Sequence, residues 1–418
     1  MEKSNNIEKF GSYLCVLLLG YMLFSFFINR FPEIAYPDGD FLCKSDDMFM
    51  DFFNTNCSAL TLNVYRNGNN QYPPFIILIA HILSRFAPYK IVSQYDLRWI
   101  PAGMISFIAV FVVSITSLFT VLIRFLVKRK IPPRGILIFV ISMLFSAPFL
   151  FLVDRGNYLI IALAFFVIFC LSFHTNPKIS AVFIGLSAAI KIYPGLLMIL
   201  FITEKKKKEF FLSLITCLFV TLLSFAFFEG NIIKNIFAFV RNLTKFGNGM
   251  PYWYMDLYFS CGLSTIVKSL YGIIGSSPFT DFFPVMMVYT CVAFLILVFS
   301  IFAIWREVFF WRRLLLLTLL IVFLTPNSYL YNLTFLIGPL VIFLTTENLQ
   351  KRNNLYFYAL LVLFAPTAYY YFNPKNALIS ISVPINCCLV LFMIVSLIIT
   401  SIFPRKYSIE ITKALTNE

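Results

Sequence analysis

Repeated runs of about twenty apolar residues constrain this chain more than any other feature of its sequence. A helix of that length crosses a lipid bilayer with all of its backbone hydrogen bonds made internally. Only 12% of the residues are charged, against about 25% in soluble proteins. The sequence therefore predicts an all-α, polytopic transmembrane helical bundle. The clearest runs are residues 11–29, 99–127, 135–153, 157–173, 210–228, 283–305, 355–371 and 380–403.

Two further apolar regions are longer than one crossing and contain polar breaks. Residues 179–203 are interrupted at Lys191 and Pro194, and residues 313–346 are interrupted between Pro326 and Asn332. We expect each region to form two shorter helices, because proline removes a backbone donor and disfavours a helical residue before it. The total is about 10–12 membrane helices, and residues 1–418 form a single integral membrane domain.

The basic residues gather in short clusters between the apolar runs. Threading the runs alternately through the membrane puts every cluster on one side, which the positive-inside rule identifies as the cytoplasm. Topology therefore explains the net charge of +14, and no nucleic acid partner is needed. The clusters are Lys128–Lys130 with Arg134, Lys205–Lys208, Arg306 with Arg312 and Arg313, Lys351 with Arg352, and Arg405 with Lys406.

The same threading places two long loops, residues 30–98 and 229–282, on the outer face. Residues 73–86 are apolar but too short to cross, so we expect an interfacial helix within the first loop. The first loop also carries an acidic patch in a chain that has only 19 acidic residues. The patch consists of Glu33, Asp38, Asp40, Asp46, Asp47 and Asp51.

Three acids of this patch, Asp46, Asp47 and Asp51, alternate with Phe and Met side chains. Asp47 and Asp51 are four positions apart, so a helix would place them on one face. Paired carboxylates beside apolar groups acquire raised pKa values through desolvation and mutual repulsion, which suits proton abstraction from a hydroxyl. We therefore take these three as candidate catalytic residues. The alternative is a solvated loop that keeps the outer face soluble.

Lys191 is a cation in an otherwise apolar stretch. A charge at bilayer depth costs about 3 kcal/mol or more, so such residues are usually functional. Together with Arg155 and Arg98, Lys191 could form an anion pocket, and phosphate is the expected ligand of such a pocket. The alternative is a lysine that extends to the lipid headgroups.

Polar residues also occur where the chain turns or extends on the outer face. Arg155 and Asn157 lie in a tight turn between two apolar runs, where Arg155 could pair with Asp154 and Asn157 could cap the next helix. Tyr72 precedes two prolines that fix the chain as extended.

Several chemistries are excluded by what the sequence lacks. The two histidines and the absence of a CxxC pair argue against a zinc site or an iron–sulfur cluster. There is no GxxxxGK[ST] phosphate loop, no GxSxG elbow and no HExxH motif. An ATP-driven pump, a serine hydrolase and a metalloprotease are therefore not expected.

Taken in order, these features resemble the polytopic C-type glycosyltransferases, and more narrowly glycosyltransferase family 87, the polyprenyl-phosphate-mannose-dependent mannosyltransferases. The resemblance covers roughly residues 10–345, and it rests on the acidic patch, Tyr72 with its two prolines, the Gly156-Asn157 helix start, and the segment from Ala188 to Pro194.

The resemblance implies an inverting transfer of a hexose from a lipid-phosphate donor to an acceptor hydroxyl at the outer face. A first-loop Asp would be the general base, here Asp47 or Asp51 with Asp46 third. Lys191 and Arg155 would meet the phosphate, and Tyr193 lies in the most specific matching segment. Asn327 lies in the late break, on the acceptor side. Because metal-assisted C-type enzymes exist, a divalent cation could bind Asp46 and Asp47.

The expected partners are a polyprenyl-phosphate sugar, a glycolipid or glycan acceptor, and the lipid of a bacterial cytoplasmic membrane, with the active site facing outward. A transporter or flippase of lipid-linked sugars is the main alternative, and a surface-polysaccharide polymerase is another. A transporter would carry acids along a path through the bilayer. The acids here crowd one outer loop instead, which favours the transferase.

Overall fold

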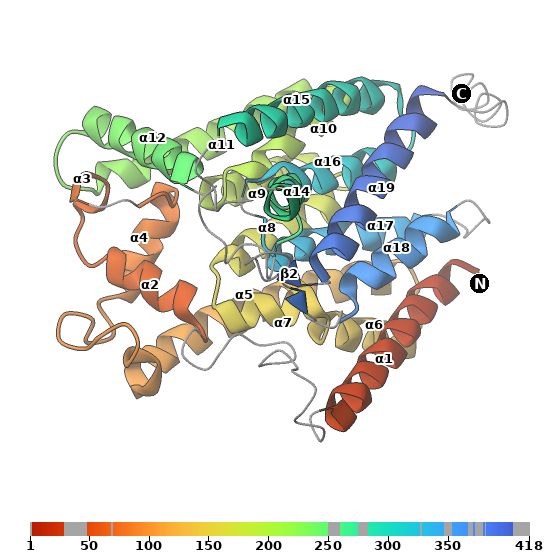
Figure 1. Ribbon diagram of the computed structural model, residues 1–418, viewed down its shortest axis with the longest axis horizontal. Helices are drawn as coiled ribbons and strands as arrows, with labels where there is room; N and C mark the ends of the chain where they lie inside the picture. Colours follow the sequence, from red (N-terminus) through yellow and green to blue (C-terminus); the bar gives the residue numbers. More distant parts are fainter. Residues whose placement is uncertain are drawn as a thin grey trace.

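A computed structural model describes residues 2–28, 48–67, 70–249, 260–274, 283–326, 328–346, 353–366, 371–372, 379–380 and 382–403. Almost all of the regular structure in these residues is helical (Figure 1). The helices are α1 (Glu2–Ile28), α2 (Met50–Ser58), α3 (Val64–Asn67), α4 (Pro74–Leu83), η1 (Leu97–Trp99), α5 (Pro101–Lys128), α6 (Pro133–Leu144), α7 (Ala147–Arg155), α8 (Leu159–Ser172), α9 (Pro177–Ile190), η2 (Tyr193–Met198), α10 (Ile199–Thr203), α11 (Lys207–Ala226), α12 (Ile232–Gly249), α14 (Leu263–Ile274), α15 (Phe283–Arg306), α16 (Phe310–Leu324), η4 (Leu330–Leu336), α17 (Ile337–Thr346), α18 (Asn354–Phe364) and α19 (Ser382–Ile402).

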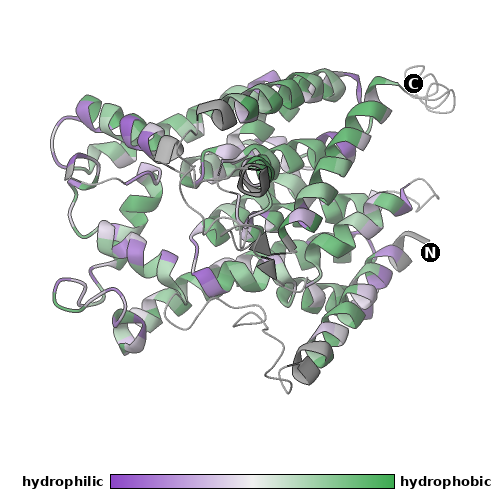
Figure 2. Ribbon diagram, viewed as in Figure 1, coloured by the Kyte–Doolittle hydropathy of each residue, from purple (hydrophilic) through white to green (hydrophobic). Residues whose placement is uncertain are grey.

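The predicted all-α, polytopic membrane architecture is confirmed. The described strands are a single antiparallel pair of two residues each, β1 (Tyr371–Phe372) and β2 (Ile379–Ser380). Hydrophobic residues make up most of the helices, and hydrophilic residues gather in α2, α3 and α12 and near the start of α1 (Figure 2). This distribution is that of a multi-pass membrane protein.

The number of long spans differs from the predicted 10–12. Among the described helices, four are long and apolar enough to cross a membrane alone, namely α5, α11, α15 and α19. The pair α6 and α7 would make a fifth, bent by 51°. The remaining apolar segments are helices of 10–17 residues. Hydropathy overestimated the long helices because it does not register where the chain breaks inside an apolar run.

Each break has a local cause in the sequence. Pro148 lies in the first turn of α7. Because proline has no backbone N–H, it cannot donate the hydrogen bond that would continue α6. Lys191 is extended, with φ −135° and ψ 124°, just before Pro194 in η2. As predicted, residues 179–203 form shorter helical pieces separated at Lys191. Residues 313–346 do so as well, with a break between the end of α16 at Leu324 and the start of η4 at Leu330.

The centre of the bundle is α8, which packs against α5 and α9, while α9 in turn packs against α11. Most α8 side chains are buried, as expected of a helix that is apolar all round. Because α8 has 14 residues, its two ends are about 21 Å apart. The residues at its two ends therefore belong to separate regions of the molecule.

One of these regions contains two of the basic clusters, Lys205–Lys208 and Arg306 with Arg312 and Arg313, and the helix ends beside them. Lys206 Nζ donates to the carbonyl of Phe173, which directly follows α8. Arg313, near the start of α16, pairs with Glu204, which follows α10. We call this region the basic end.

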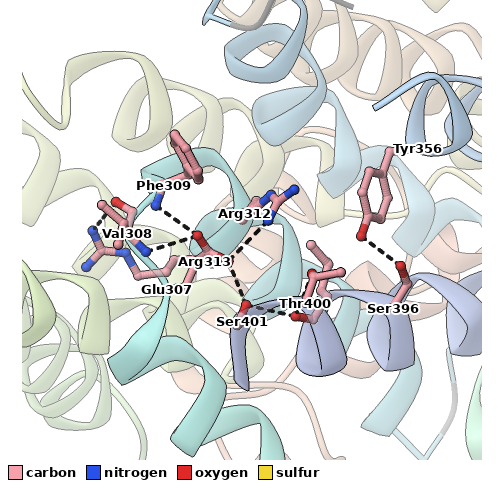
Figure 3. Close-up of polar contacts among 10 residues, drawn as sticks. Glu307, Val308, Phe309, Arg312, Arg313, Tyr356, Ser396, Thr400 and Ser401 are labelled. Carbon is pink, nitrogen blue, oxygen red and sulfur yellow. Dashed lines mark hydrogen bonds and ion pairs between the residues drawn. The ribbon is translucent and has the colours of Figure 1, made fainter. Parts of the chain in front are cut away.

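Glu307 joins three helices at the basic end (Figure 3). Its Oε1 accepts the N–H groups of Val308 and Phe309, both at 3.0 Å, just before α16 begins. Its Oε2 accepts the hydroxyl of Ser401 in α19 at 2.6 Å and lies 3.6 Å from Arg312 Nη1. A carboxylate at a helix N-terminus is favoured by the helix dipole.

Candidate functional site

The other region lies at the start of α8, on the side of the molecule where Figure 1 shows α2, α3, α4 and α12. Its first element is α2, which carries Asp51. The backbone N–H of Phe49 donates to the carbonyl of Asp154 at 2.6 Å just before α2 begins. Phe52 is fully buried and stacks on Tyr158, with ring centroids 5.2 Å apart. These contacts fix α2 against the turn that joins α7 to α8.

A buried amide sets the rotation of α2 about its axis. Asn56 Nδ2 donates to the hydroxyl of Tyr89 at 2.8 Å, and Asn56 Oδ1 accepts the hydroxyl of Tyr158. Buried polar groups that lose such partners incur the full cost of desolvation. Asn56 therefore holds α2 in one orientation and, with it, the direction in which Asp51 points.

Asp51 is held by two residues of the α7–α8 turn. Its Oδ1 lies 2.5 Å from Arg155 Nη2, and its Oδ2 accepts a hydrogen bond from Asn157 Nδ2 at 2.7 Å. The Asp51 and Arg155 side chains are 16% and 19% exposed, so the pair is largely but not completely buried. Asn157 Oδ1 also accepts the N–H of Leu159 at 2.9 Å, which is the predicted helix cap.

Gly156 allows this contact between α2 and the turn. Its φ is +64°, in the left-handed region where a side chain is strained. A Cβ atom at this position would lie 3.0 Å from both Cα and O of Phe49 and 3.1 Å from Cβ of Phe52. Only glycine lets the backbone of α2 lie directly on the turn, so Gly156 helps to bring Asp51 to Arg155 and Asn157.

Lys191 joins the same cluster from the break between α9 and η2. Its Nζ lies 4.9 Å from the ring centroid of Tyr72, a cation–π contact. Burial lowers the pKa of Lys191 to about 8, while the carboxylate of Asp51 acts in the opposite direction. Burial and the Asp51 carboxylate raise the pKa of Tyr72, and a hydrogen bond from Thr55 and the Arg155 charge oppose this. Asp51, Arg155, Lys191 and Tyr72 therefore share one electrostatic environment, which we call the site cluster.

The late break contributes a further set of polar residues beside η2. The hydroxyl of Tyr193 donates to Asn332 Oδ1 at 3.0 Å, and Asn332 Nδ2 donates to Ser328 Oγ at 3.2 Å. Tyr331 stacks on Phe151 of α7, with ring centroids 5.8 Å apart. These contacts connect the Lys191 break to η4 and to α7.

Among the described residues, Arg98 contacts the segment before α2 through a hydrogen bond to a backbone carbonyl. It is buried, at 6% exposure, and its Nη1 donates to the carbonyl of Met48 at 3.2 Å. Arg155 thus pairs with Asp51, Lys191 contacts Tyr72, and Arg98 lies against the residue that follows Asp47. Asp46, Asp47 and Asn327 lie outside the described residues.

Within the described part of the chain, no group of three or more His, Cys, Asp or Glu residues lies close enough to hold a metal ion. The residues considered for a divalent cation, Asp46 and Asp47, fall outside that part.

Sequence reasoning missed the residues that position the cluster. They are Asn56 of α2, with Tyr158 beside the start of α8 and Tyr331 of η4, and the sequence did not single out any of them. Asn56 and Tyr158 are 102 positions apart, and no local pattern predicts a contact at that separation. The one sequence signal for these positioning residues was the break at Asn332, where polar residues interrupt an apolar run.

A family model described as glycosyltransferase family 87 matches residues 70–330, more than half of the chain. The matched segment contains Arg98, Arg155, Asn157, Lys191 and Tyr193, and it begins after Asp51. Neither a curated protein nor a solved structure is detectably similar to the chain. The match agrees with the all-α, multi-pass architecture and with the resemblance seen in the sequence. The chain therefore belongs to glycosyltransferase family 87, and it is a membrane glycosyltransferase.

Proposed function

We propose that this glycosyltransferase moves a hexose, with mannose the expected sugar, from a polyprenyl-phosphate donor to a hydroxyl of a glycolipid or polysaccharide acceptor. The observation that carries the proposal is the site cluster, in which a carboxylate, two cations and an aromatic ring meet at one end of a lipid-embedded bundle. Transfer from a lipid-phosphate sugar needs these groups, because a proton must leave the acceptor while negative charge develops on the phosphate.

Asp51 is the proposed general base. As the acceptor oxygen attacks the anomeric carbon, its proton passes to the carboxylate and the bond from that carbon to the phosphate oxygen breaks. The electron pair of the broken bond leaves with polyprenyl phosphate. A carboxylate has about four lone-pair positions, so Asp51 can accept this proton while Arg155 and Asn157 keep it oriented. Attack on the face opposite the leaving group inverts the configuration at the anomeric carbon. Asp46 and Asp47 are the other candidates for the base.

Lys191 and Arg155 are the proposed partners of the phosphate. Both are cations in a partly buried environment, where a charge-assisted hydrogen bond is stronger than in water. Lys191 is held in place by the Tyr72 ring, and its amino group has three donors for phosphate oxygens. The Tyr72, Tyr193 and Tyr331 rings provide flat apolar surfaces near these charges for the sugar.

We also propose that the site faces outward from a bacterial cytoplasmic membrane, in the assembly of envelope or surface polysaccharide. The argument is the position of two basic clusters, those of Lys206 and Arg313, beside the end of α8 that is far from the site cluster. By the positive-inside rule that far end is cytoplasmic. A lipid-phosphate donor suits the outer face because it carries its sugar without a nucleotide.

The test is release of polyprenyl phosphate by purified protein in lipid vesicles. The vesicles would contain a polyprenyl-phosphate hexose and a crude glycolipid acceptor, with a nucleotide hexose supplied in a parallel reaction. We expect release from the lipid donor only when acceptor is present, and no transfer from the nucleotide sugar. A donor that stays intact with every acceptor and moves between leaflets would overturn the proposal in favour of a flippase.

A further inference from the structure

The helix α12 divides its side chains into three sectors, and one of them attaches it to the site end of the protein. Asn235, Ala238 and Asn242 are buried, at 2%, 8% and 4% exposure. Asn242 Nδ2 donates to the backbone carbonyls of Tyr65 at 3.1 Å and Asn70 at 3.3 Å. The attached sector therefore fixes α12 beside the segment that leads to Tyr72.

A second sector of α12 is apolar and exposed. Ile233, Phe237 and Val240 are 62%, 70% and 52% exposed. They recur at intervals of four and three residues, so they form one stripe along the helix. An exposed stripe of large apolar side chains needs a partner that is not water.

The third sector is basic. Lys234, Arg241 and Lys245 are all exposed, and their spacing of seven and four residues puts them on one line along the helix. At 3.6 residues per turn this line lies about 100° from the apolar stripe, between that stripe and the attached sector. An apolar sector and a separate basic sector on different faces of one helix are the pattern of a helix lying in a membrane interface.

The preceding helix places α12 at the membrane surface. α11 is long and apolar enough to span the membrane and ends at Ala226, six positions before α12 begins at Ile232. α12 itself is not among the helices that could span. A helix that follows a span after so short a connection starts at the level of the lipid headgroups.

We propose that α12 lies on the membrane surface at the site end of the protein, with its apolar stripe in the acyl region and its basic sector bound to anionic phosphate headgroups. The proposed partner is a lipid surface that carries net negative charge, because three cations and no acidic residue lie on α12. Such a helix concentrates anionic lipids beside the segment that supports Tyr72.

The test is photo-crosslinking in lipid nanodiscs made from equal parts of phosphatidylglycerol and phosphatidylcholine. Benzoylphenylalanine would replace Phe237 in one variant and Arg241 in a matched variant, and lipid adducts would be measured by mass spectrometry. We expect acyl-chain adducts at position 237, and about tenfold fewer at position 241, because only the apolar stripe enters the lipid. This readout does not depend on glycosyl transfer.

Two outcomes would overturn the proposed location. The first is no lipid adduct at position 237, and the second is equal adduct formation at both positions, which is expected of a helix surrounded by acyl chains. A further variant, Lys234→Gln with Arg241→Gln and Lys245→Gln, tests the choice of lipid. We expect it to retain less phosphatidylglycerol than the unchanged protein, with phosphatidylcholine unaffected, and equal retention would overturn the choice of an anionic surface. The thermal unfolding temperature of each variant checks that it has folded.

Discussion

Two lysines lie over aromatic rings at opposite ends of the molecule, and they differ in what else holds them. Lys206 Nζ lies 4.4 Å from the ring centroid of Phe173 and donates to the Phe173 carbonyl at 3.0 Å. Lys191 Nζ lies 4.9 Å from the ring centroid of Tyr72 and makes no hydrogen bond or ion pair with the described residues. The first lysine is satisfied within the protein, whereas in the proposed function the second offers its donors to the phosphate.

The carboxylates of the two ends differ in the same way. Glu307 caps the start of α16 through two backbone N–H groups and accepts a hydroxyl from α19 (Figure 3). Asp51 contacts Arg155 and Asn157 but retains 16% exposure. The comparison teaches that ion pairs hold helices together at the basic end, whereas the Asp51 pair at the other end stays partly exposed, as the proposed general base requires.

The largest effect is expected from Asp51→Asn, which keeps the shape of the side chain and removes its charge. Loss of a general base lowers turnover by about 10²–10⁴-fold. The measurement is the rate of polyprenyl phosphate release per folded molecule. The matched control is Glu204→Gln, which breaks the pair with Arg313 at the basic end.

For Glu204→Gln we expect a lower unfolding temperature, since Arg313 loses its partner, with turnover changed less than about twofold. Equal losses of turnover in both variants would remove the distinction between the two ends. Full activity in Asp51→Asn would assign the base to another residue.

The next effect is a dependence on pH that comes from Lys191. Its pKa of about 8 means that the ammonium is charged below that pH and neutral above it. Phosphate binding needs the charged form, so turnover should fall as pH rises through about 8, by up to about tenfold per further unit. Rates between pH 6 and pH 10 measure this. Lys191→Arg keeps its charge throughout this range, and its profile should stay flat. An identical alkaline decline in that variant would contradict the role of Lys191.

A smaller effect is expected from Gly156→Ala. The left-handed φ of +64° and the contacts of a new Cβ with Phe49 should cost about 1–3 kcal/mol of folding free energy. We expect a lower unfolding temperature and turnover reduced by about tenfold, because α2 must move and Asp51 with it. The control is Gly20→Ala in α1, where nothing lies within 4 Å of the added Cβ. Alanine favours a helix interior by about 1 kcal/mol, so this control should not destabilise.

Much of the candidate site could be predicted from the sequence because its charged residues interrupt or border apolar runs. Asp51, Arg155 and Lys191 are charges beside or within apolar runs, and each was recognised by that contrast. Their pairing could not be predicted. Arg155 and Asp51 are 104 positions apart, and the fold decides whether Arg155 reaches Asp51.

The helix lengths show the same limit. Residues 157–173 have the composition of a full span, yet α8 is a 14-residue helix, Leu159–Ser172. The breaks at Lys191 and after Leu324 could be located from the sequence. The packing that ends a helix inside an apolar run depends on neighbours far along the chain, and hydropathy carries no information about them.

The most direct test of the central claim is the binding of polyprenyl phosphate, the proposed leaving group, to the protein without acceptor. The dissociation constant would be measured for the unchanged protein, for Lys191→Ala and for Lys206→Ala. We predict binding weakened about 10- to 100-fold in Lys191→Ala, since a charge-assisted hydrogen bond contributes about 1.5–3 kcal/mol, and unchanged binding in Lys206→Ala. Unchanged affinity in Lys191→Ala, or equal weakening in both variants, would contradict the account.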